Sequence, residues 1–506
     1  MKVLFISAEV APYSFIGGLA QVSFFLPRAL KKLGVDIRIF TPKYGTFNEK
    51  LYPTQMVYQG LKVPTGEKPD SGYPQELICN IKTLKVQKKD EPVVYFLENM
   101  EYYEKRANVY NYSDDHIRFG LLSRAALEFV KKHEFIPDTI HANDWHSSYI
   151  LNYLRHSYQD NPTLKKIATL LSIHNLYHGI SFDHDHASEM DFDDGKGSLA
   201  SFFSDRFLKQ NPLKRGIVNA DIINTVSRTY AHEILTEEYA PYLYNLFREL
   251  RGKLFGILNG LDYQEFNPSS DKIIKKNYSS SNIRPRQENK SDLQQEFGLN
   301  LSPRTPLLAF YGRLDGQKGL DLILETIDFV LTELDVQLVI VGSGDDYYRD
   351  FFSSLEKKYP GRVGTHLMFD SSLPKKIISG ADILLMPSLF EPGGIVAMEA
   401  QRYGCVPVAR STGGLADSIE NFDSLSHKGT GFTFRTYSAM GFMTAIVRAL
   451  ETYHSPNIWN KIIVQAMKKN FSWDNSAHQY LELYQKTCKF RSLALLSRPH
   501  FDFSKL

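Results

Sequence analysis

Short apolar runs alternate with amphipathic segments along the first half of the chain. The apolar run KVLFISAEV (2–10) precedes an amphipathic stretch at 19–34, and a second apolar run follows at 35–42. Farther on, a predicted strand at 138–144 precedes another amphipathic segment at 147–158. Continuous apolar runs are typical of parallel strands buried on both faces, and apolar positions three and four residues apart indicate the covering helices. This half is predicted to form a parallel sheet between two layers of helices.

The alternation lapses at 267–292, which is polar, rich in serine and without apolar periodicity, so we expect a loop or domain connection there. Strand and helix patterns restart at 305 and continue beyond 400. We predict an α/β fold with two doubly wound Rossmann-like domains facing each other across a cleft. The domains are placed at 1–262 and 263–475, with a C-terminal helix at 476–506 that packs back on the first domain.

Length and composition narrow the class of protein. The 506 residues exceed what one hydrophobic core supports, and 43% hydrophobic with 23% charged residues is ordinary for a soluble globular protein. A net charge of +2 gives no broad field for nucleic acid or a membrane, and three distant cysteines form no disulfide framework. No secretory signal or apolar stretch of membrane-spanning length is present in the sequence. We expect a cytoplasmic protein that binds neither nucleic acid nor membrane.

Ligands of doubly wound sheets bind beyond the carboxyl ends of the strands, so residues just after each predicted strand are the candidates. Arg313 ends the apolar run at 305–313, and we place it with Lys318 in the loop after this strand, where Gly316 and Gly319 let two cations converge. Such a pair suits a diphosphate, because it neutralises charge on a leaving group. The plainer alternative is a solvated loop with two unrelated charges.

The segment FEPGGIVAMEAQRYG (390–404) opens a second candidate site. A helix beginning there offers amides to a phosphate, and Glu391 ahead of it either accepts hydrogen bonds from sugar hydroxyls or interacts with the helix dipole. Glu399 is either a further donor-binding residue or an exposed helix position. The turn FIGGLAQV (15–22) resembles STGGLADSI (411–419), so we expect a second anion-binding turn. The predicted amide donors are at Gly17, Gly18, Gly394, Ile395 and Val396.

Two further strand ends carry a cluster of imidazole, carboxyl and amide groups. Asp144 and His146 follow one strand, and His174 and Asn175 follow the next, with His178 nearby. Clustered imidazoles suggest a metal site, but no cysteine lies close and the asparagines favour hydrogen bonds to a polyhydroxylated ligand. We therefore predict no metal and no cofactor. Neither a dinucleotide-binding G-x-G-x-x-G fingerprint with its acidic residue nor a Walker A motif is present.

Taken together, these motifs resemble the retaining two-domain glycosyltransferases of the GT-B fold, and more narrowly bacterial glycogen synthases and plant starch synthases. The resemblance runs from residue 1 to about residue 485 and rests on VLFISAEVAPYSFIGGLAQV, YSDDHIRFGLLSRAALEF, IHANDWHSSY, IHNLYHGI, INTVSRTYAHEI, GILNGLDYQEFNP, GRLDGQKGLDLI, FEPGGIVAMEAQRYG and RSTGGLADSI. It implies transfer of glucose, with retention, from ADP-glucose (or, alternatively, UDP-glucose) to the non-reducing 4-hydroxyl of an α-1,4-glucan.

The resemblance also implies roles for individual residues. Arg313 and Lys318 would hold the diphosphate, His146 would contact the donor glucose, Asn259 would lie by the sugar–phosphate linkage, and Glu391 would bind glucose hydroxyls. Weaker sugar or acceptor contacts are implied for Asp144, His174, Asn175 and Gln21. The departing phosphate would itself take the acceptor's proton, so neither a dedicated nucleophile nor a metal would be required.

This chain departs from the family pattern at four positions. Phe15 stands where the family has lysine, Gln21 replaces an aspartate, and Arg228 replaces a proline. Glu399 resembles wider GT-B transferases more than many glycogen synthases. The alternatives are family drift with activity retained, a transferase with another nucleotide sugar or a small acceptor, and a slow or non-catalytic glucan-binding paralogue.

Overall fold

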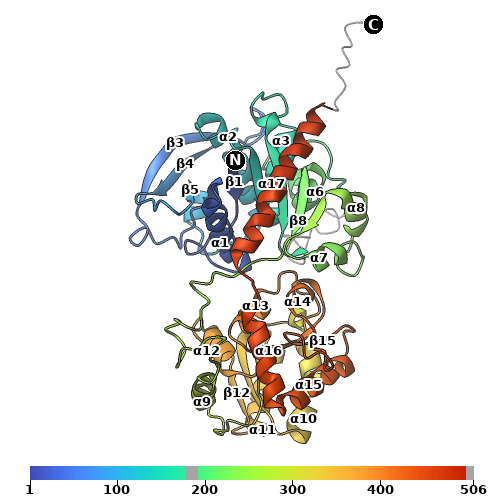
Figure 1. Ribbon diagram of the computed structural model, residues 1–506. Coiled ribbons are helices and arrows are strands. Elements are labelled where there is room, and N and C mark those ends of the chain that lie inside the picture. Colours follow the sequence, from blue (N-terminus) through green and yellow to red (C-terminus); the bar gives the residue numbers. More distant parts are fainter. Residues whose placement is uncertain (177–191, 497–506) are drawn as a thin grey trace. The chain divides into compact units, whose positions relative to one another are not determined.

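The computed structural model describes residues 1–176 and 192–496 and divides the chain into two compact units. Unit 1 comprises 1–226, 231–257 and the segment from 473 onward, and unit 2 comprises 227–230 and 258–472. Figure 1 shows a β-sheet in each unit, with helices packed against it. The predicted α/β class with parallel sheets is confirmed.

Unit 1 is built on a sheet whose strand order is β3-β4-β5-β2-β1-β6-β7-β8-β9. The strands from β5 to β9 in that order are mutually parallel, whereas the β3–β4 hairpin extends the sheet antiparallel at one edge. The sequence analysis did not predict this hairpin. The strand bounds are β1 (Lys2–Ile6), β2 (Asp36–Pro42), β3 (Thr54–Pro64), β4 (Glu76–Leu84), β5 (Val93–Glu98), β6 (Thr139–Asn143), β7 (Ala168–Ile173), β8 (Ile222–Thr225) and β9 (Leu254–Gly256).

The helices of unit 1 bury their apolar faces against this sheet. They include α1 (Gly18–Lys32), α2 (Asp115–Lys132), α3 (Asp144–Arg155), α5 (Asp205–Leu208), α6 (Pro212–Asn219), α7 (Arg228–Glu233, shared with unit 2), α8 (Tyr244–Glu249) and α17 (Trp473–Leu496). The predicted C-terminal helix is confirmed as α17, and its final predicted residues, 497–506, lie outside the described part. Tyr480 and Tyr484 of α17 pack into one apolar cluster with Leu26 and Leu30 of α1.

Unit 2 contains a second sheet, with strand order β12-β11-β10-β13-β14-β15 and parallel pairing throughout the described strands. Its strands are β10 (Leu307–Leu314), β11 (Gln337–Gly344), β12 (Val363–His366), β13 (Ile383–Met386), β14 (Val406–Arg410) and β15 (Phe432–Phe434). Its helices include α9 (Arg286–Glu296), α10 (Leu320–Glu333), α11 (Asp346–Lys358), α12 (Leu373–Gly380), α13 (Ile395–Arg402), α14 (Gly413–Ser418), α15 (Ala439–Tyr453) and α16 (Pro456–Lys468).

The polar segment at 267–292 belongs to unit 2 and does not connect two domains. Ile274 and Tyr278 are buried in the unit 2 core, and Lys290 Nζ lies 2.6 Å from Asp382 Oδ2. The chain passes between units at 226/227, 230/231, 257/258 and 472/473, and the sequence analysis placed its two boundaries at 262/263 and 475/476. A few buried residues fix this segment in unit 2, although its composition resembles that of a linker.

The strand order of each sheet reverses between one pair of neighbouring strands, and predicted site residues lie at both reversals. In unit 1 the reversal lies between β1 and β6, and in unit 2 it lies between β10 and β13. The connections leave such a pair of strands in opposite directions, which opens a crevice beyond their carboxyl ends. Most of the predicted site residues follow these four strands.

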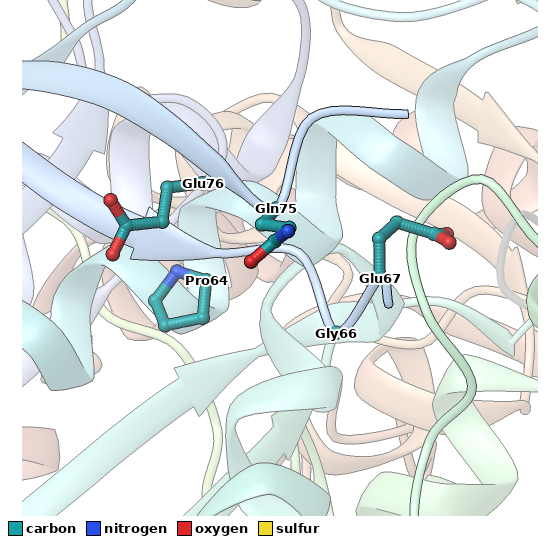
Figure 2. Close-up of a pocket in the computed structure, with 5 residues that line it drawn as sticks. All are labelled: Pro64, Gly66, Glu67, Gln75 and Glu76. Carbon is teal, nitrogen blue, oxygen red and sulfur yellow. The ribbon is translucent and has the colours of Figure 1, made fainter. Parts of the chain in front are cut away.

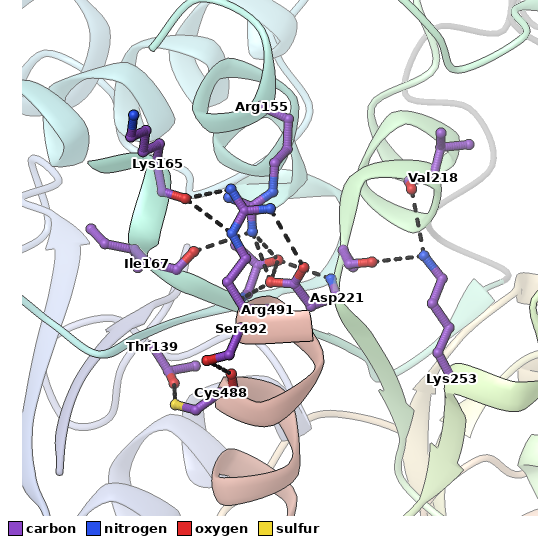
Figure 3. A network of polar contacts seen from close by, with 12 residues as sticks. Thr139, Arg155, Lys165, Ile167, Val218, Asp221, Lys253, Cys488, Arg491 and Ser492 are labelled. Carbon is purple, nitrogen blue, oxygen red and sulfur yellow. Dashed lines mark hydrogen bonds and ion pairs between the residues drawn. The ribbon is translucent and has the colours of Figure 1, made fainter. Parts of the chain in front are cut away.

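A network of buried ion pairs and hydrogen bonds connects the end of α17 to the rest of unit 1 (Figure 3). Asp221 Oδ2 lies 2.7 Å from Arg155 Nη2 and accepts hydrogen bonds from the Thr169 amide (2.8 Å) and hydroxyl (2.9 Å). Arg491 of α17 lies 4.0 Å from Asp221 Oδ1 and donates from Nε to Lys165 O at 3.0 Å. Asp221 is therefore the anion between two arginines.

Removing this anion leaves Arg155 buried without its counter-charge. We expect D221A to lower the free energy of unfolding by about 3–5 kcal/mol, the usual cost of breaking a buried pair. Urea titration measures the change. The control is D36A, whose pair with Arg38 is half exposed and is expected to change stability by less than about 1 kcal/mol. Equal effects of the two substitutions would contradict the role of Asp221.

Candidate functional site

The β10–β13 reversal in unit 2 brings three predicted residues to one sheet edge. Arg313 is near the carboxyl end of β10, Lys318 ends the short 3-10 helix that follows, and Glu391 follows β13. Lys318 Nζ lies 2.6 Å from Glu391 Oε2. Gly319, at φ +70°, makes this approach possible, because a Cβ there would collide with Pro387 O.

The prediction of a loop at Arg313 is wrong, because β10 continues to Leu314 and Arg313 is its penultimate residue. Its half-exposed guanidinium pairs with Asp315 Oδ2 at 3.0 Å and donates to Gln317 Oε1 at 2.8 Å. Both predicted cations therefore have carboxylate partners in the protein without ligand. An incoming anion must compete with Asp315 and Glu391 for them.

The second glycine turn has a packing role that the sequence analysis missed. The Gly414 amide donates to Glu391 O at 2.8 Å, and Gly413 has φ +44°. A Cβ on Gly413 would collide with Glu391 O, and one on Gly414 would collide with Gly393. This turn thus fixes the backbone that carries Glu391, and its predicted anion-binding role stays a prediction.

Helix α13 begins at Ile395 directly after Gly394, which has φ +62° and makes no side-chain cap. The first amides of a helix lack intrahelical partners, so those of Ile395 and Val396 can donate to an anion. Glu399, farther along α13, is buried, which corrects the alternative that it is exposed. It accepts a hydrogen bond from Tyr311 Oη of β10 at 3.0 Å, and burial raises its pKa to about 7.

Asn259 also belongs to unit 2 and is 5% exposed. Its Oδ1 is buried and has no hydrogen-bond partner among the described residues. A buried carbonyl oxygen without a donor costs free energy, and a ligand hydroxyl would satisfy it. This observation agrees with the ligand contact that the family resemblance implies.

In unit 1, Glu9 follows β1 and organises the first glycine turn. Its Oε2 accepts from the amides of Ile16 (2.7 Å) and Gly17 (3.1 Å), and its Oε1 accepts from Tyr110 Oη at 3.1 Å. The Gly17 amide is thus engaged by a carboxylate, and phosphate binding there requires this bond to break. Gly18 begins α1. Burial raises the pKa of Glu9 despite these hydrogen bonds.

The first turn of α3, directly after β6, carries His146, whose imidazole is enclosed by aromatic rings. Its ring centroid lies 4.6 Å from that of Tyr110, 4.8 Å from that of Phe119 and 4.0 Å from that of Trp145. Tyr110 therefore joins His146 to Glu9. The sequence analysis named neither Glu9 nor Tyr110, although an acidic residue directly after a strand at the reversal is a signal for the former.

Asp144 and His174 hold the ends of β6 and β7 together. Asp144 Oδ1 accepts from the His174 amide at 2.7 Å, and His174 Nε2 lies 3.0 Å from Asn143 Oδ1. Burial raises the pKa of Asp144 to about 7 and lowers that of His174 to about 4, so this imidazole is neutral at pH 7. Asn175 is adjacent and partly exposed, while His178 lies outside the described residues.

The acceptor contact that the family resemblance implies for Gln21 stays a prediction. Gln21 lies on α1 and is partly exposed. A pocket of about 400 Å³ at the end of the β3–β4 hairpin is lined by Pro64, Gly66, Glu67, Gln75 and Glu76, and contains no predicted site residue (Figure 2). Within residues 1–176 and 192–496, no cluster of His, Cys, Asp and Glu is arranged to hold a metal ion. No helix in these ranges is long and apolar enough to cross a membrane.

Comparison with known proteins gives a consistent result over the whole chain. Residues 2–249 match the family model of the starch synthase catalytic domain, and residues 292–465 match that of glycosyl transferases group 1. Glycogen synthases of Thermotoga petrophila and Bacillus cereus are 39% and 37% identical, each over 96% of this chain and 99% of the relative. The catalytic domain of starch synthase IV from Arabidopsis thaliana, bound to ADP and acarbose, superposes with a TM-score of 0.81 at 30% identity, over 96% of this chain and 99% of that one.

The burial of Glu399 predicts how the free energy of unfolding depends on pH. Its raised pKa means that the folded protein holds a proton that the unfolded chain releases between about pH 4.5 and pH 7. This stabilisation is complete below pH 4.5 and is lost as the pH rises through 7. Relative to E399Q, wild-type stability should fall by up to about 1.4 kcal/mol per pH unit in that window. Urea titrations from pH 5 to 8 measure the slope, with E325Q on the exposed face of α10 as the control. Parallel curves for wild type and E399Q would contradict the assignment.

Proposed function

The chain belongs to the glycogen and starch synthase family of glycosyltransferases, and from this membership we propose a specific reaction. The enzyme transfers glucose from ADP-glucose to the non-reducing 4-hydroxyl of an α-1,4-glucan, with retention at the anomeric carbon. The observation that carries this proposal is the convergence of Arg313, Lys318 and Glu391 at the strand-order reversal of unit 2.

Arg313, Lys318 and the first amides of α13 bind the diphosphate of the donor. The diphosphate takes the place of Asp315 and Glu391 as partner of the two cations, and it presents more negative charge than either carboxylate. As the sugar–phosphate bond breaks, further charge develops on the leaving oxygen. The two cations stabilise that charge most, so they lower the barrier as well as improving binding.

Release of Lys318 frees Glu391 to bind the glucose hydroxyls of the donor. Its backbone is held by the Gly414 amide, and Ser388 Oγ lies 3.4 Å from its Oε2. Asn259 supplies an acceptor oxygen that has no partner among the described residues. The contact of His146 with the donor glucose follows from the family resemblance and stays a prediction.

The chemical step balances without a covalent enzyme intermediate. The C1–O bond to the β-phosphate breaks, and the C1–O4 bond to the acceptor forms on the same face of the sugar. The 4-hydroxyl proton passes to the departing phosphate oxygen, and ADP leaves. The enzyme contributes positioning and a fixed positive field.

The preference for ADP-glucose over UDP-glucose draws support from an exposed ring at the same sheet edge. Phe369, which follows β12, is 80% exposed, and its neighbour Met368 is 63% exposed. A free aromatic face stacks on a nucleobase, and the larger purine offers more overlap. The relative from Arabidopsis was solved with ADP bound. A cytoplasmic location stays a prediction from the sequence.

Turnover of ADP-glucose with glycogen, measured as released ADP and as lengthened α-1,4 chains, tests the reaction. R313A and K318A should each lower kcat by about a hundredfold or more, the usual loss for a preorganised charge stabiliser. K358A is the matched control, because Lys358 is an exposed lysine of unit 2 paired with Asp328. No turnover with either ADP-glucose or UDP-glucose would overturn the proposal. Turnover only with another hexose donor or a small acceptor would favour the alternative transferase.

Phe369 is tested separately through the donor. We expect F369A to raise the KM for ADP-glucose by about fivefold or more, because a stacked base contributes about 1–3 kcal/mol. The KM for glycogen should not change. F329A provides a control, since Phe329 is also exposed but lies on α10. An unchanged KM for ADP-glucose in F369A would remove the argument for base stacking.

A further inference from the structure

Two large apolar side chains are exposed where the first glycine turn begins in unit 1. Phe15 is 52% exposed and Ile16 is 60% exposed, and both lie between β1 and the start of α1. This position is the carboxyl end of β1, at the strand-order reversal, where ligands bind in doubly wound sheets. Water around two such side chains is costly, so their exposure at a binding edge indicates a ligand surface.

The backbone beneath these side chains is held in place. The Ile16 and Gly17 amides donate to Glu9, which is itself 3% exposed. Ser14 adds a second anchor, because its amide donates to Val10 O at 3.0 Å and its hydroxyl accepts from the Val10 amide at 3.0 Å. The Phe15–Ile16 pair therefore stands on a preorganised turn, and ordering it costs little on binding.

The charges around this turn do not favour an anion. The titratable side chains at the ends of β1, β6 and β7 and at the start of α3 are Glu9, Asp144, His146 and His174. None of them is a lysine or arginine, and burial keeps the imidazole of His174 neutral. Lys43, which follows β2, lies 3.0 Å from Glu98 and 3.4 Å from Glu104. Phe15 thus occupies the family's lysine position at strand ends, those of β1, β6 and β7, that supply no lysine or arginine in its place.

We propose that Phe15 and Ile16 form the acceptor platform, on which the apolar face of a glucose unit at the non-reducing end of the glucan packs. A pyranose ring presents C–H groups on its face and hydroxyls around its edge. The Phe15 ring would contact the face, while polar groups of the same edge receive the hydroxyls. The family lysine is thereby replaced by a surface selective for the acceptor. This inference rests on the proposed function, because it takes the glucan as the second substrate.

Binding measured without turnover separates this inference from the reaction itself. Isothermal titration with maltohexaose alone, and with ADP alone, is compared for wild type, F15A, F15Y and the control F329A. We expect F15A to weaken maltohexaose binding about fivefold or more and to leave ADP binding unchanged, as fits loss of one aromatic contact. F15Y retains the ring and should bind maltohexaose within about twofold of wild type. Thermal unfolding confirms that each variant is folded.

The outcomes distinguish the two claims. Loss of ADP affinity in F15A with maltohexaose affinity intact would overturn the acceptor platform. So would an F15A variant that binds each ligand as tightly as wild type does, or a wild-type protein that does not bind maltohexaose. Weakened maltohexaose binding in F15A supports the platform. If wild type shows that binding yet releases no ADP from ADP-glucose in the presence of glycogen, the platform stands and the proposed reaction fails.

Discussion

The ion pair between Lys318 and Glu391 is the constraint on which the site in unit 2 depends. It joins the segment after β10 to the segment after β13, the two strands between which the order of the sheet reverses. Gly319 and Gly413 let the backbones approach closely enough for the pair to form. The pair keeps a partly buried ammonium and carboxylate compensated until a diphosphate arrives, so the site is assembled before its ligand binds.

In unit 1 a carboxylate, that of Glu9, fixes the backbone at the strand-order reversal. Glu9 gathers the Ile16 and Gly17 amides and the Tyr110 hydroxyl, and Tyr110 packs on His146. The proposed acceptor platform of Phe15 and Ile16 stands on this turn. The division of chemistry between the units follows: cations at the edge of unit 2 and an apolar, hydrogen-bonding surface at the edge of unit 1.

The sequence predicted the features that depend on local pattern and missed those that depend on tertiary packing. Apolar runs identified β1, β10 and β13, and the residues at or after the ends of β10 and β13 include Arg313, Lys318 and Glu391. The β3–β4 hairpin was missed because its buried and exposed residues are interspersed and form no continuous apolar run. The segment at 267–292 is a loop up to residue 285, as one alternative expected, but it does not connect two domains, because a few buried residues, such as Tyr278, anchor it in unit 2. Burial of Glu399 and occupation of the Gly17 amide depend on partners distant in sequence, Tyr311 and Glu9, which no local pattern reveals.

The central claim is that the cations of unit 2 recognise a diphosphate. Calorimetric titration of the wild-type protein with ADP and with AMP, at several salt concentrations, tests it most directly, because the two ligands share a base and a ribose and differ in the β-phosphate. ADP should bind at least about tenfold more tightly than AMP, and the difference should shrink as salt screens the charges. Equal affinity for ADP and AMP at low salt would contradict the account.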